Sequence, residues 1–127
     1  MTPNVFRIKE IKDGKEVIGR INLVLYQRQG IPHIEFELDE GFRGKGIMSS
    51  ELPKYLKKFR CQGGKRLIAV VNKDNQASIK VLEKNKFIKI ATFDDVFGYV
   101  IAFDLMEEIK EFQKKALKSM VQNLGSF

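Results

Sequence analysis

The spacing of hydrophobic residues predicts a hairpin followed by a third strand in the first forty positions. Residues 5–11 and 16–26 are rich in strand-forming side chains and flank Asp13-Gly14, a dipeptide that favours a tight hairpin turn. A second turn is expected at Gln29-Gly30. Residues 33–39 then place Ile34, Phe36 and Leu38 in alternation with Glu35, Glu37 and Asp39. This alternation predicts a strand with one apolar and one acidic face.

The pattern then changes to helical spacing. After a glycine-containing turn, Leu52, Tyr55, Leu56 and Phe59 lie on one face of a predicted helix, which Pro53 should kink. Residues 66–71 read as a short buried strand. The next helix should begin at Asp74 as its N-cap and turn Ala77, Val81 and Leu82 inward.

The carboxy-terminal third predicts a hairpin and one long helix. Residues 87–93 and 96–104 should pair around Asp94-Asp95, and residues 105–124 carry apolar side chains at three- and four-residue steps. These are Leu105, Ile109, Phe112, Ala116, Leu117, Met120, Val121 and Leu124. The predicted order is β-β-β-α-β-α-β-β-α, an α/β fold of the α+β kind with a mixed sheet.

Composition is that of one globular domain spanning residues 1–127. The chain has 43% hydrophobic and 31% charged residues, no apolar run near the ~20 residues of a membrane span, and no signal-peptide profile at its start. We therefore expect a cytoplasmic protein without membrane association. Cys61 is the only cysteine. It can form no internal disulfide and belongs to no metal-ligand cluster, so we expect no metal and an inert thiol. The formal charge of +7 could indicate a nucleic-acid partner, but the lysines are spread along the chain and not gathered in one run. Attraction for a polyphosphate cofactor or an acidic partner explains the charge equally well.

The turn at residues 43–46 has the features of a phosphate site. Gly44 and Gly46 remove side chains where a strand passes into a helix, and backbone N–H groups at a helix start are unpaired and carry the positive end of the dipole. Arg43 and Lys45 add positive charge to the same turn.

Two segments together resemble the GNAT superfamily of acetyl-CoA-dependent N-acetyltransferases. Arg43-Gly44-Lys45-Gly46-Ile47-Met48 fits the family's R-x-x-G-x-G/A cofactor loop, except that Met48 occupies the last position. About thirty residues on, Asn75 and Ser78, then Leu82-Glu83-Lys84 and Phe87, resemble the N-x-x-S and L-E-K-x-G-F pattern of the branch that acetylates protein N-termini, including those of ribosomal proteins. Lys86 replaces the usual glycine, and Asn85 is expected to take the left-handed conformation that ends the helix.

The resemblance implies a GNAT-like fold in which two strands splay apart around the pantetheine arm of the cofactor. The family normally has two helices before this sheet that floor its acceptor site, and we expect no counterpart of them in this sequence. The resemblance also implies acetyl-CoA as co-substrate and a set of cofactor contacts. These are Phe36, Leu38, Arg43, Gly44, Lys45, Gly46, Ile47, Met48, Asn75, Ser78 and Lys80.

Several of these contacts have structural alternatives. Lys45, Lys80 and also Lys73 are candidate partners for cofactor phosphates, or simply solvated lysines. Asn75 could instead cap a turn, and Ser78 could satisfy its own helix backbone. Met48 could crowd the pyrophosphate, although a methionine side chain is flexible enough to turn aside.

Transfer of an acetyl group to an amine needs a base, a donor to the carbonyl oxygen and an acid for the thiolate. Glu37, Glu35 and His33 are candidate bases, with Glu37 nearest the expected splay; each could equally be an ordinary strand residue. The resemblance implies a backbone N–H near Leu38 as the oxyanion donor. It also implies Ser78 as the acid, because Leu82 stands where the wider family often has tyrosine.

Two function classes fit the sequence. One is an N-acetyltransferase that acts on a protein N-terminus, a lysine or a small amine by direct attack. The other is a weak or inactive GNAT-fold domain that binds CoA or a protein or nucleic-acid partner. The helix at 105–124 should either close its own sheet or form a homodimer contact. In both cases we expect truncation after Asp104 to leave an insoluble or molten product.

Overall fold

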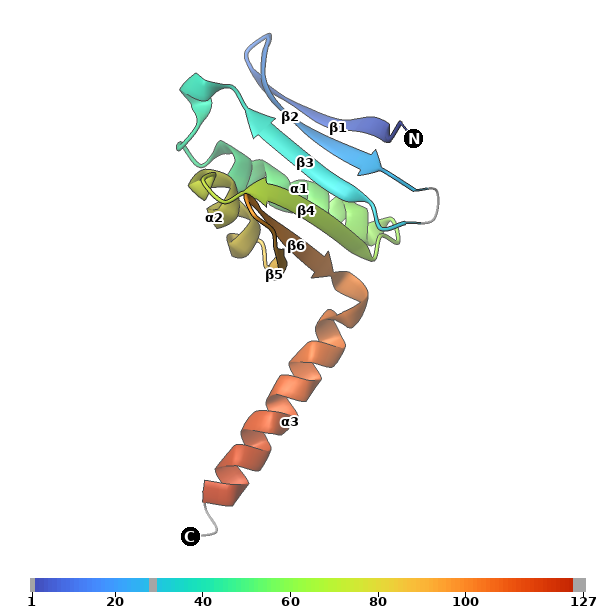
Figure 1. Ribbon diagram of the computed structural model, residues 1–127, viewed down its shortest axis with the longest axis vertical. Helices are drawn as coiled ribbons and strands as arrows, with labels where there is room; N and C mark the ends of the chain where they lie inside the picture. Colours follow the sequence, from blue (N-terminus) through green and yellow to red (C-terminus); the bar gives the residue numbers. More distant parts are fainter. Residues whose placement is uncertain (1, 28–29, 125–127) are drawn as a thin grey trace.

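The computed structural model describes residues 2–27 and 30–124, except for the side chains of residues 106, 107, 109, 123 and 124. The elements follow the predicted order (Figure 1). They are β1 (Asn4–Asp13), β2 (Glu16–Leu25), β3 (His33–Leu38), α1 (Ile47–Cys61), β4 (Arg66–Asn72), α2 (Gln76–Lys84), β5 (Ile88–Thr92), β6 (Val96–Ala102) and α3 (Met106–Leu124), with short 3-10 turns η1 (Glu40–Phe42) and η2 (Phe103–Leu105). The predicted α/β architecture with a mixed sheet is therefore confirmed.

The six strands form one sheet in the order β1-β2-β3-β4-β6-β5. All neighbours are antiparallel except β3 and β4. These two parallel strands share one registered pair, His33 with Ile68, and the N–H of Ile68 donates to the carbonyl of Pro32 at 3.0 Å. Beyond that point they are no longer paired. The sheet is thus open between the carboxyl ends of β3 and β4, as the resemblance implied.

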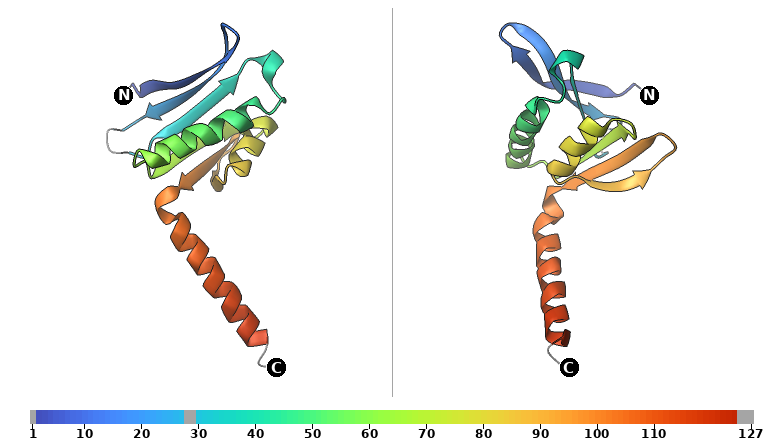
Figure 2. Two further views of the ribbon diagram at one scale, coloured as in Figure 1. Left: turned by 180° about the vertical axis from the view of Figure 1, so that it is seen from behind. Right: turned by 90° about the vertical axis from the view of Figure 1, so that its left-hand side faces the viewer.

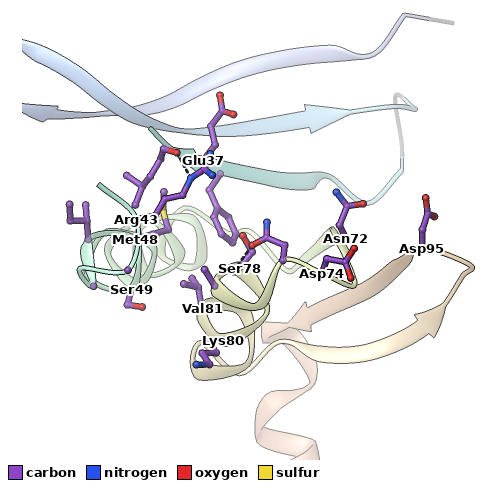
Figure 3. Close-up of a pocket in the computed structure, with 17 residues that line it drawn as sticks. Glu37, Arg43, Met48, Ser49, Asn72, Asp74, Ser78, Lys80, Val81 and Asp95 are labelled. Carbon is purple, nitrogen blue, oxygen red and sulfur yellow. Dashed lines mark hydrogen bonds between the residues drawn. The ribbon is translucent and has the colours of Figure 1, made fainter. Parts of the chain in front are cut away.

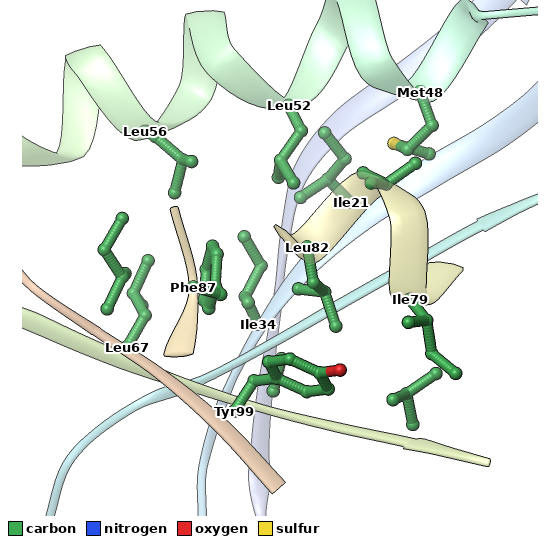
Figure 4. Packing of buried hydrophobic residues seen from close by; sticks show 14 of the residues in the cluster. Ile21, Ile34, Met48, Leu52, Leu56, Leu67, Ile79, Leu82, Phe87 and Tyr99 are labelled. Atoms are coloured by element: carbon green, nitrogen blue, oxygen red, sulfur yellow. The ribbon is translucent and has the colours of Figure 1, made fainter. Parts of the chain in front are cut away.

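Both crossover helices lie on the same face of the sheet. The connections β3-α1-β4 and β4-α2-β5 each join parallel strands and move in the same direction across the sheet, so right-handed crossovers place both helices on one side. Figure 4 shows α1 and α2 packed over the strands, with Leu52 and Leu82 meeting Ile21, Leu67 and Tyr99 in a fully buried core.

The ends of α2 differ from the prediction. Its N-cap is Asn75, not Asp74, because the Asn75 side chain accepts a hydrogen bond from the N–H of Ser78 at 3.1 Å. At the other end Lys86, not Asn85, takes the left-handed conformation with φ 71°. The side chain of Asn85 instead donates to the carbonyl of Val81 at 2.8 Å, which satisfies a carbonyl near the helix end.

Helix α3 does not fold back onto its own sheet. It leaves the domain after η2 and projects away from it as a single helix (Figures 1 and 2). Phe112, Leu117, Met120 and Val121 are 60–72% exposed. The side chains of Ile109 and Leu124, which belong to the predicted stripe, lie outside the described residues. The expectation that α3 closes its own sheet is therefore wrong for this chain.

No helix in the described part of the chain is both long and apolar enough to cross a membrane.

Candidate functional site

The turn between η1 and α1 is shaped to receive an anion. Gly44 and Gly46 have φ of 75° and 78°, a region that favours glycine, and a Cβ added at either would meet no atom within 4 Å. Gly46 is the N-cap of α1, and the first helical bond runs from the N–H of Ser50 to its carbonyl at 3.1 Å. Helix geometry leaves the N–H groups of residues 47–49 without intrahelical acceptors. The open turn and these donors together fit a phosphate.

The two cations of this turn have different positions. The Nε of Arg43 donates to the carbonyl of Leu38 at 2.9 Å, so this side chain ties the turn to the end of β3 and also lines the adjoining cavity. The Nζ of Lys45 lies 5.6 Å from the ring centre of Phe42, and Lys45 is not among the residues that line the cavity. The structure thus does not bring Lys45 to the predicted phosphate site.

A cavity of about 1000 Å³ lies between the 43–48 turn, the end of β3 and the start of α2 (Figure 3). It contains nearly all the predicted cofactor contacts, although they come from two segments that are thirty residues apart in sequence. Its lining comprises Phe36, Glu37, Leu38, Arg43, Gly44, Gly46, Ile47, Met48, Ser49, Asn72, Asp74, Asn75, Ala77, Ser78, Lys80, Val81 and Asp95.

A second cavity of about 310 Å³ lies in the opening between β3 and β4. Its lining includes Arg20, Asn22 and Glu35, which lie on β2 and β3. Five residues line both cavities, namely Phe36, Glu37, Asn72, Asn75 and Ser78. The large and small cavities therefore adjoin at these residues, where two bound molecules would meet.

The backbone of β3 turns hydrogen-bonding groups toward this opening. The N–H of Asp39 donates to the carbonyl of Ile18 at 2.7 Å, and Leu38 stands opposite Gly19, so Leu38 and Gly19 form a non-hydrogen-bonded pair. In such a pair the N–H and C=O groups point away from the neighbouring strand. The N–H of Leu38 and, two residues earlier, of Phe36 therefore point to the β4 side, where β3 has lost its partner. Leu38 is thus in position for the oxyanion role that the resemblance implied.

Glu37 lies at the junction of the two cavities, and its side chain is 61% exposed. It is hydrogen-bonded to the guanidinium of Arg20, its partner across β2. Arg20 also approaches a carboxylate oxygen of Asp39 at 3.6 Å. The bond to Glu37 is the largest influence on Arg20 and raises the pKa of its guanidinium above the usual value. The Glu37 carboxylate is thereby oriented and charge-balanced.

The other two candidate bases are less well placed. Glu35 lines only the smaller cavity. His33 stands at the far end of β3, where its ring contacts Tyr26 edge-on at 4.7 Å, and it lines neither cavity. Burial lowers the pKa of His33 below its usual value, and the charge of Glu35 opposes that effect. The structure does not bring His33 to the site.

Ser78 stands half-buried in the first turn of α2 and lines both cavities. Asn75 precedes it as the N-cap, so the capping role that the sequence left open for Asn75 is its observed role, and its side chain still borders the cavities. Leu82, one turn after Ser78, is a buried core residue at 1% exposure and offers no proton.

Three further predicted contacts differ in their surroundings. Lys80 lines the large cavity. Lys73 does not; its Nζ lies 5.5 Å from the ring centre of Phe97. Met48 lines the cavity wall but is only 5% exposed, because its side chain packs into the core near Leu52 (Figure 4). Its side chain turns inward and does not occupy the turn, which is the second of the two alternatives that the sequence left open for Met48.

Sequence reasoning missed Asn72, Asp95 and Arg20. Asn72 is the last residue of β4. Asp95 lies in the turn between β5 and β6, and this turn approaches the cavity where the carbonyl of Asp95 accepts a hydrogen bond from the N–H of Lys73 at 3.0 Å. Arg20 had a usable signal, because it is the only charged residue in the interior of β2, whose other charge, Glu16, is at the first position. Within residues 2–27 and 30–124, no group of His, Cys, Asp and Glu side chains could hold a metal ion.

Several solved structures have the same fold as this chain. Ribosomal-protein-S5-alanine acetyltransferase from Vibrio fischeri is 23% identical with a TM-score of 0.63, and the match covers 72% of this chain and 57% of that one. RimJ from Mycobacterium smegmatis, solved with CoA-disulfide, is 17% identical with a TM-score of 0.67, covering 80% and 55%. YncA from Salmonella typhimurium, described as a putative acetyltransferase with its cofactor acetyl-CoA, is 16% identical with a TM-score of 0.64, covering 72% and 61%. The chain thus spans about 55 to 61% of these proteins.

Among curated protein sequences, none matches the chain significantly. The model of the acetyltransferase (GNAT) domain matches residues 2–88, which is more than half of the chain and includes both the 43–48 turn and the Asn75–Ser78 segment. With the open sheet and the cavity at that turn, this match shows that the chain belongs to the GNAT acetyltransferase family.

Proposed function

We propose that this protein is an N-acetyltransferase that moves the acetyl group of acetyl-CoA directly to a primary amine. The observation that carries the proposal is the meeting of two cavities at Glu37 and Ser78. One cavity has the volume and the anion-binding turn for a cofactor, and the other is a small opening through the sheet. A direct transfer requires this arrangement, because donor and acceptor must be bound at the same time.

The 43–48 turn would hold the phosphates of acetyl-CoA. The backbone N–H groups at the start of α1 supply donors, and Lys80 on the opposite wall supplies a positive charge. When bound, acetyl-CoA supplies the activated thioester carbonyl. The residues of this chain would hold it beside the opening between β3 and β4.

Glu37 would act as the base for the amine. The nitrogen of the neutral amine attacks the carbonyl carbon, and the proton it loses passes to Glu37 directly or through water. A primary amine with a pKa near 10 is mostly protonated at neutral pH. A carboxylate at the cavity junction therefore both attracts the cation and accepts its proton. Arg20 keeps this carboxylate in place.

The N–H of Leu38 would stabilise the developing negative charge on the carbonyl oxygen, since it points into the opening. As the carbon–sulfur bond breaks, the hydroxyl of Ser78 would donate a proton to the departing thiolate and regain one from solvent. The products are an acetylated amine and the free thiol of CoA.

The acceptor is a primary amine of a protein N-terminus, a lysine or a small molecule. The names of two structural relatives, the S5-alanine acetyltransferase and RimJ, make N-terminal peptides the first acceptors to try. Candidate peptides should include an N-terminal alanine, with N-acetylated versions that carry one lysine as controls. Acetylation of the first set alone would identify an N-terminal acceptor.

Thiol release from acetyl-CoA with an amine panel tests the proposal. We expect release that depends on the acceptor and falls by roughly 10² or more in Glu37→Gln. Glu40→Gln, an exposed carboxylate outside both cavities, should be close to wild type. A rise in melting temperature with acetyl-CoA but no release with any acceptor would instead favour the alternative, a GNAT-fold domain that binds CoA without transfer. No rise and no release would refute both.

A further inference from the structure

The carbonyl oxygen of Leu38 lies at the open end of β3 and accepts a hydrogen bond from a side chain. Leu38 and Gly19 form a non-hydrogen-bonded pair, so both the N–H and the C=O of Leu38 point to the β4 side, where the two strands are no longer paired. The Nε of Arg43 donates to this carbonyl at 2.9 Å and takes the place of the missing strand (Figure 3). The N–H of the same residue faces the same opening, and it is the donor that the proposed function assigns to the carbonyl oxygen of acetyl-CoA.

The short turn η1 brings Arg43 to this position. The N–H of Phe42 donates to the carbonyl of Asp39 at 2.9 Å, and the N–H of Arg43 donates to the carbonyl of Glu40 at 3.3 Å. These bonds fold residues 39–43 into a compact turn, so Arg43 reaches back to a residue five positions earlier. A charged donor makes a stronger hydrogen bond than a neutral one. The bond should therefore hold the end of β3 in one position.

The positive charge of Arg43 has no negative partner in the part of the chain that the structure describes. Arg20 and Arg66, by contrast, each bind a carboxylate. Arg43 lines the large cavity beside the glycine turn, and a guanidinium has two further nitrogens beyond Nε. Such a group suits a phosphate, because its N–H groups can contact two oxygens at once. While Nε holds Leu38, the terminal nitrogens are thus available to an anion in the cavity.

We propose that Arg43 is a positioning residue that links the binding of acetyl-CoA to the polarisation of its acetyl group. The terminal nitrogens of Arg43 contact a phosphate of the cofactor, and Nε holds the end of β3 so that the N–H of Leu38 stays directed at the thioester oxygen. Arg43 acts on the acetyl group only through Leu38. The inference rests on the proposed function and adds to it that one side chain serves both the phosphate and the thioester parts of the cofactor.

Two substitutions of Arg43 separate the two roles. Glutamine has its amide Nε2 at the same number of bonds from the backbone as the Nε of arginine, but it carries no charge and has no nitrogen further out. Lysine keeps the charge one bond further out and has a carbon in the place of Nε. Arg43→Gln can therefore keep the bond to Leu38 and lose the phosphate contact. Arg43→Lys can keep the charge and lose the bond to Leu38.

Calorimetry with acetyl-CoA measures the first role, and infrared difference spectra of acetyl-CoA labelled with ¹³C at the thioester carbonyl measure the second. A donated hydrogen bond weakens the C=O bond, so the wild-type complex should show a lower stretching frequency than free acetyl-CoA. Arg43→Gln should bind about tenfold more weakly and keep the lowered frequency. Arg43→Lys should bind within about threefold of wild type, with a frequency close to that of free acetyl-CoA. In an assay of thiol release, Arg43→Lys should lower kcat about tenfold.

Arg60→Lys is the matched control, because it makes the same substitution on α1 outside both cavities. It should equal wild type in affinity and in frequency, and melting curves show that each variant is folded. Two Arg43 variants that lose affinity and frequency shift in parallel would give Arg43 a merely structural role and overturn the proposal. Wild-type values in both variants, or no lowered frequency in the wild-type complex, would also overturn it.

The binding and infrared measurements need no acceptor, so the two proposals can fail separately. A wild-type protein that binds acetyl-CoA and lowers its carbonyl frequency but releases no thiol with any amine would refute the proposed transfer. The opposite effects of Arg43→Gln and Arg43→Lys would still decide the role of Arg43. A wild-type protein that does not bind acetyl-CoA would refute both proposals.

Discussion

At the residue scale, the proposed cofactor site depends on the absence of side chains at Gly44 and Gly46. Both have positive φ, and both face open space where the phosphates would lie. A side chain added there would meet no other atom of the protein, although the positive φ strains residues other than glycine. Between two variants with comparable strain, a difference in binding would therefore come from overlap with the ligand and from charge. This separates the site from glycines that are required only by packing, such as Gly64, whose Cβ would meet the ring of Phe59 at 2.3 Å.

Gly46→Asp should therefore abolish or severely weaken the binding of acetyl-CoA. Gly46→Asn is the matched control, because asparagine has nearly the same size, tolerates positive φ comparably, and carries no charge. We expect the aspartate variant to bind at least about tenfold more weakly than the asparagine variant, about 1.4 kcal/mol. Isothermal calorimetry on folded protein measures this difference. Equal affinities for the two variants would mean that phosphates do not lie at this turn.

Ser78→Ala should lower turnover more than it weakens cofactor binding. A proton donor to the thiolate matters chiefly while charge develops in the transition state, so kcat should fall roughly 10- to 100-fold with little change in the Kd for acetyl-CoA. The N–H of Ser78 that bonds to Asn75 belongs to the backbone, so the helix cap survives the substitution. An unchanged kcat, with chemistry shown to limit the rate, would remove Ser78 from the mechanism.

At the element scale, η2 determines how α3 meets the domain. Arg66 lowers the pKa of Asp104 below its usual value, through two hydrogen bonds and its charge. Because the pKa of Asp104 is lower in the folded chain than in the unfolded one, the ion pair stabilises the fold fully at pH values above about 3.8, the ordinary pKa of an unfolded aspartate. That contribution is lost as the pH falls through the lowered pKa of the folded state. The junction should thus be firm at neutral pH and weaker in acid.

Asp104→Asn should therefore reduce stability modestly at pH 7 and make no difference at a pH below the folded pKa of Asp104. Urea unfolding at a series of pH values between 7 and 2 measures the change. Asp13→Asn in the β1–β2 turn is the control, because Asn-Gly favours the same turn as Asp-Gly. A loss of stability in Asp104→Asn that stayed constant down to the lowest pH would show that the ion pair is not its source.

At the scale of the whole molecule, the core and α3 are separate. All buried hydrophobic side chains of the described residues lie between Ile11 and Ile101, and none belongs to α3. The expectation drawn from the sequence, that loss of this helix leaves a molten product, therefore has to be revised. That expectation assumed that the apolar stripe either folds back onto the sheet of its own chain or packs against a second copy.

A chain that ends at Leu105 should be soluble and should melt cooperatively, because it keeps η2 and the whole core. Differential scanning calorimetry tests this, with the full-length protein as reference. The truncated chain should also bind acetyl-CoA with the same affinity, since the cavity lining ends at Asp95. A broad, non-cooperative transition would show that α3 is needed for folding after all.

The sequence alone was enough to predict the order of the elements and the phosphate turn, because both are local properties. Alternation and helical spacing depend on side chains a few residues apart, and Gly44 and Gly46 mark backbone that other residues rarely adopt. The family motif then placed Asn75 and Ser78 beside the turn. The ends of helix α2 were predicted less accurately. Asp74 and Asn75 are both good N-caps, and only the geometry of the chain shows which of them accepts the hydrogen bond from the N–H of Ser78.

Tertiary structure decided which residues meet. Glu35 and Glu37 are equivalent in the strand pattern, yet only Glu37 lies at the junction of both cavities, since the parting of β3 from β4 places it there. Lys45 and Lys80 are equally basic, yet only Lys80 lines the cavity. The sequence predicts the apolar stripe of α3, but the direction of this helix depends on bonds from η2 to residues nearly forty positions earlier. Such contacts join distant segments, and no local pattern of side chains encodes them.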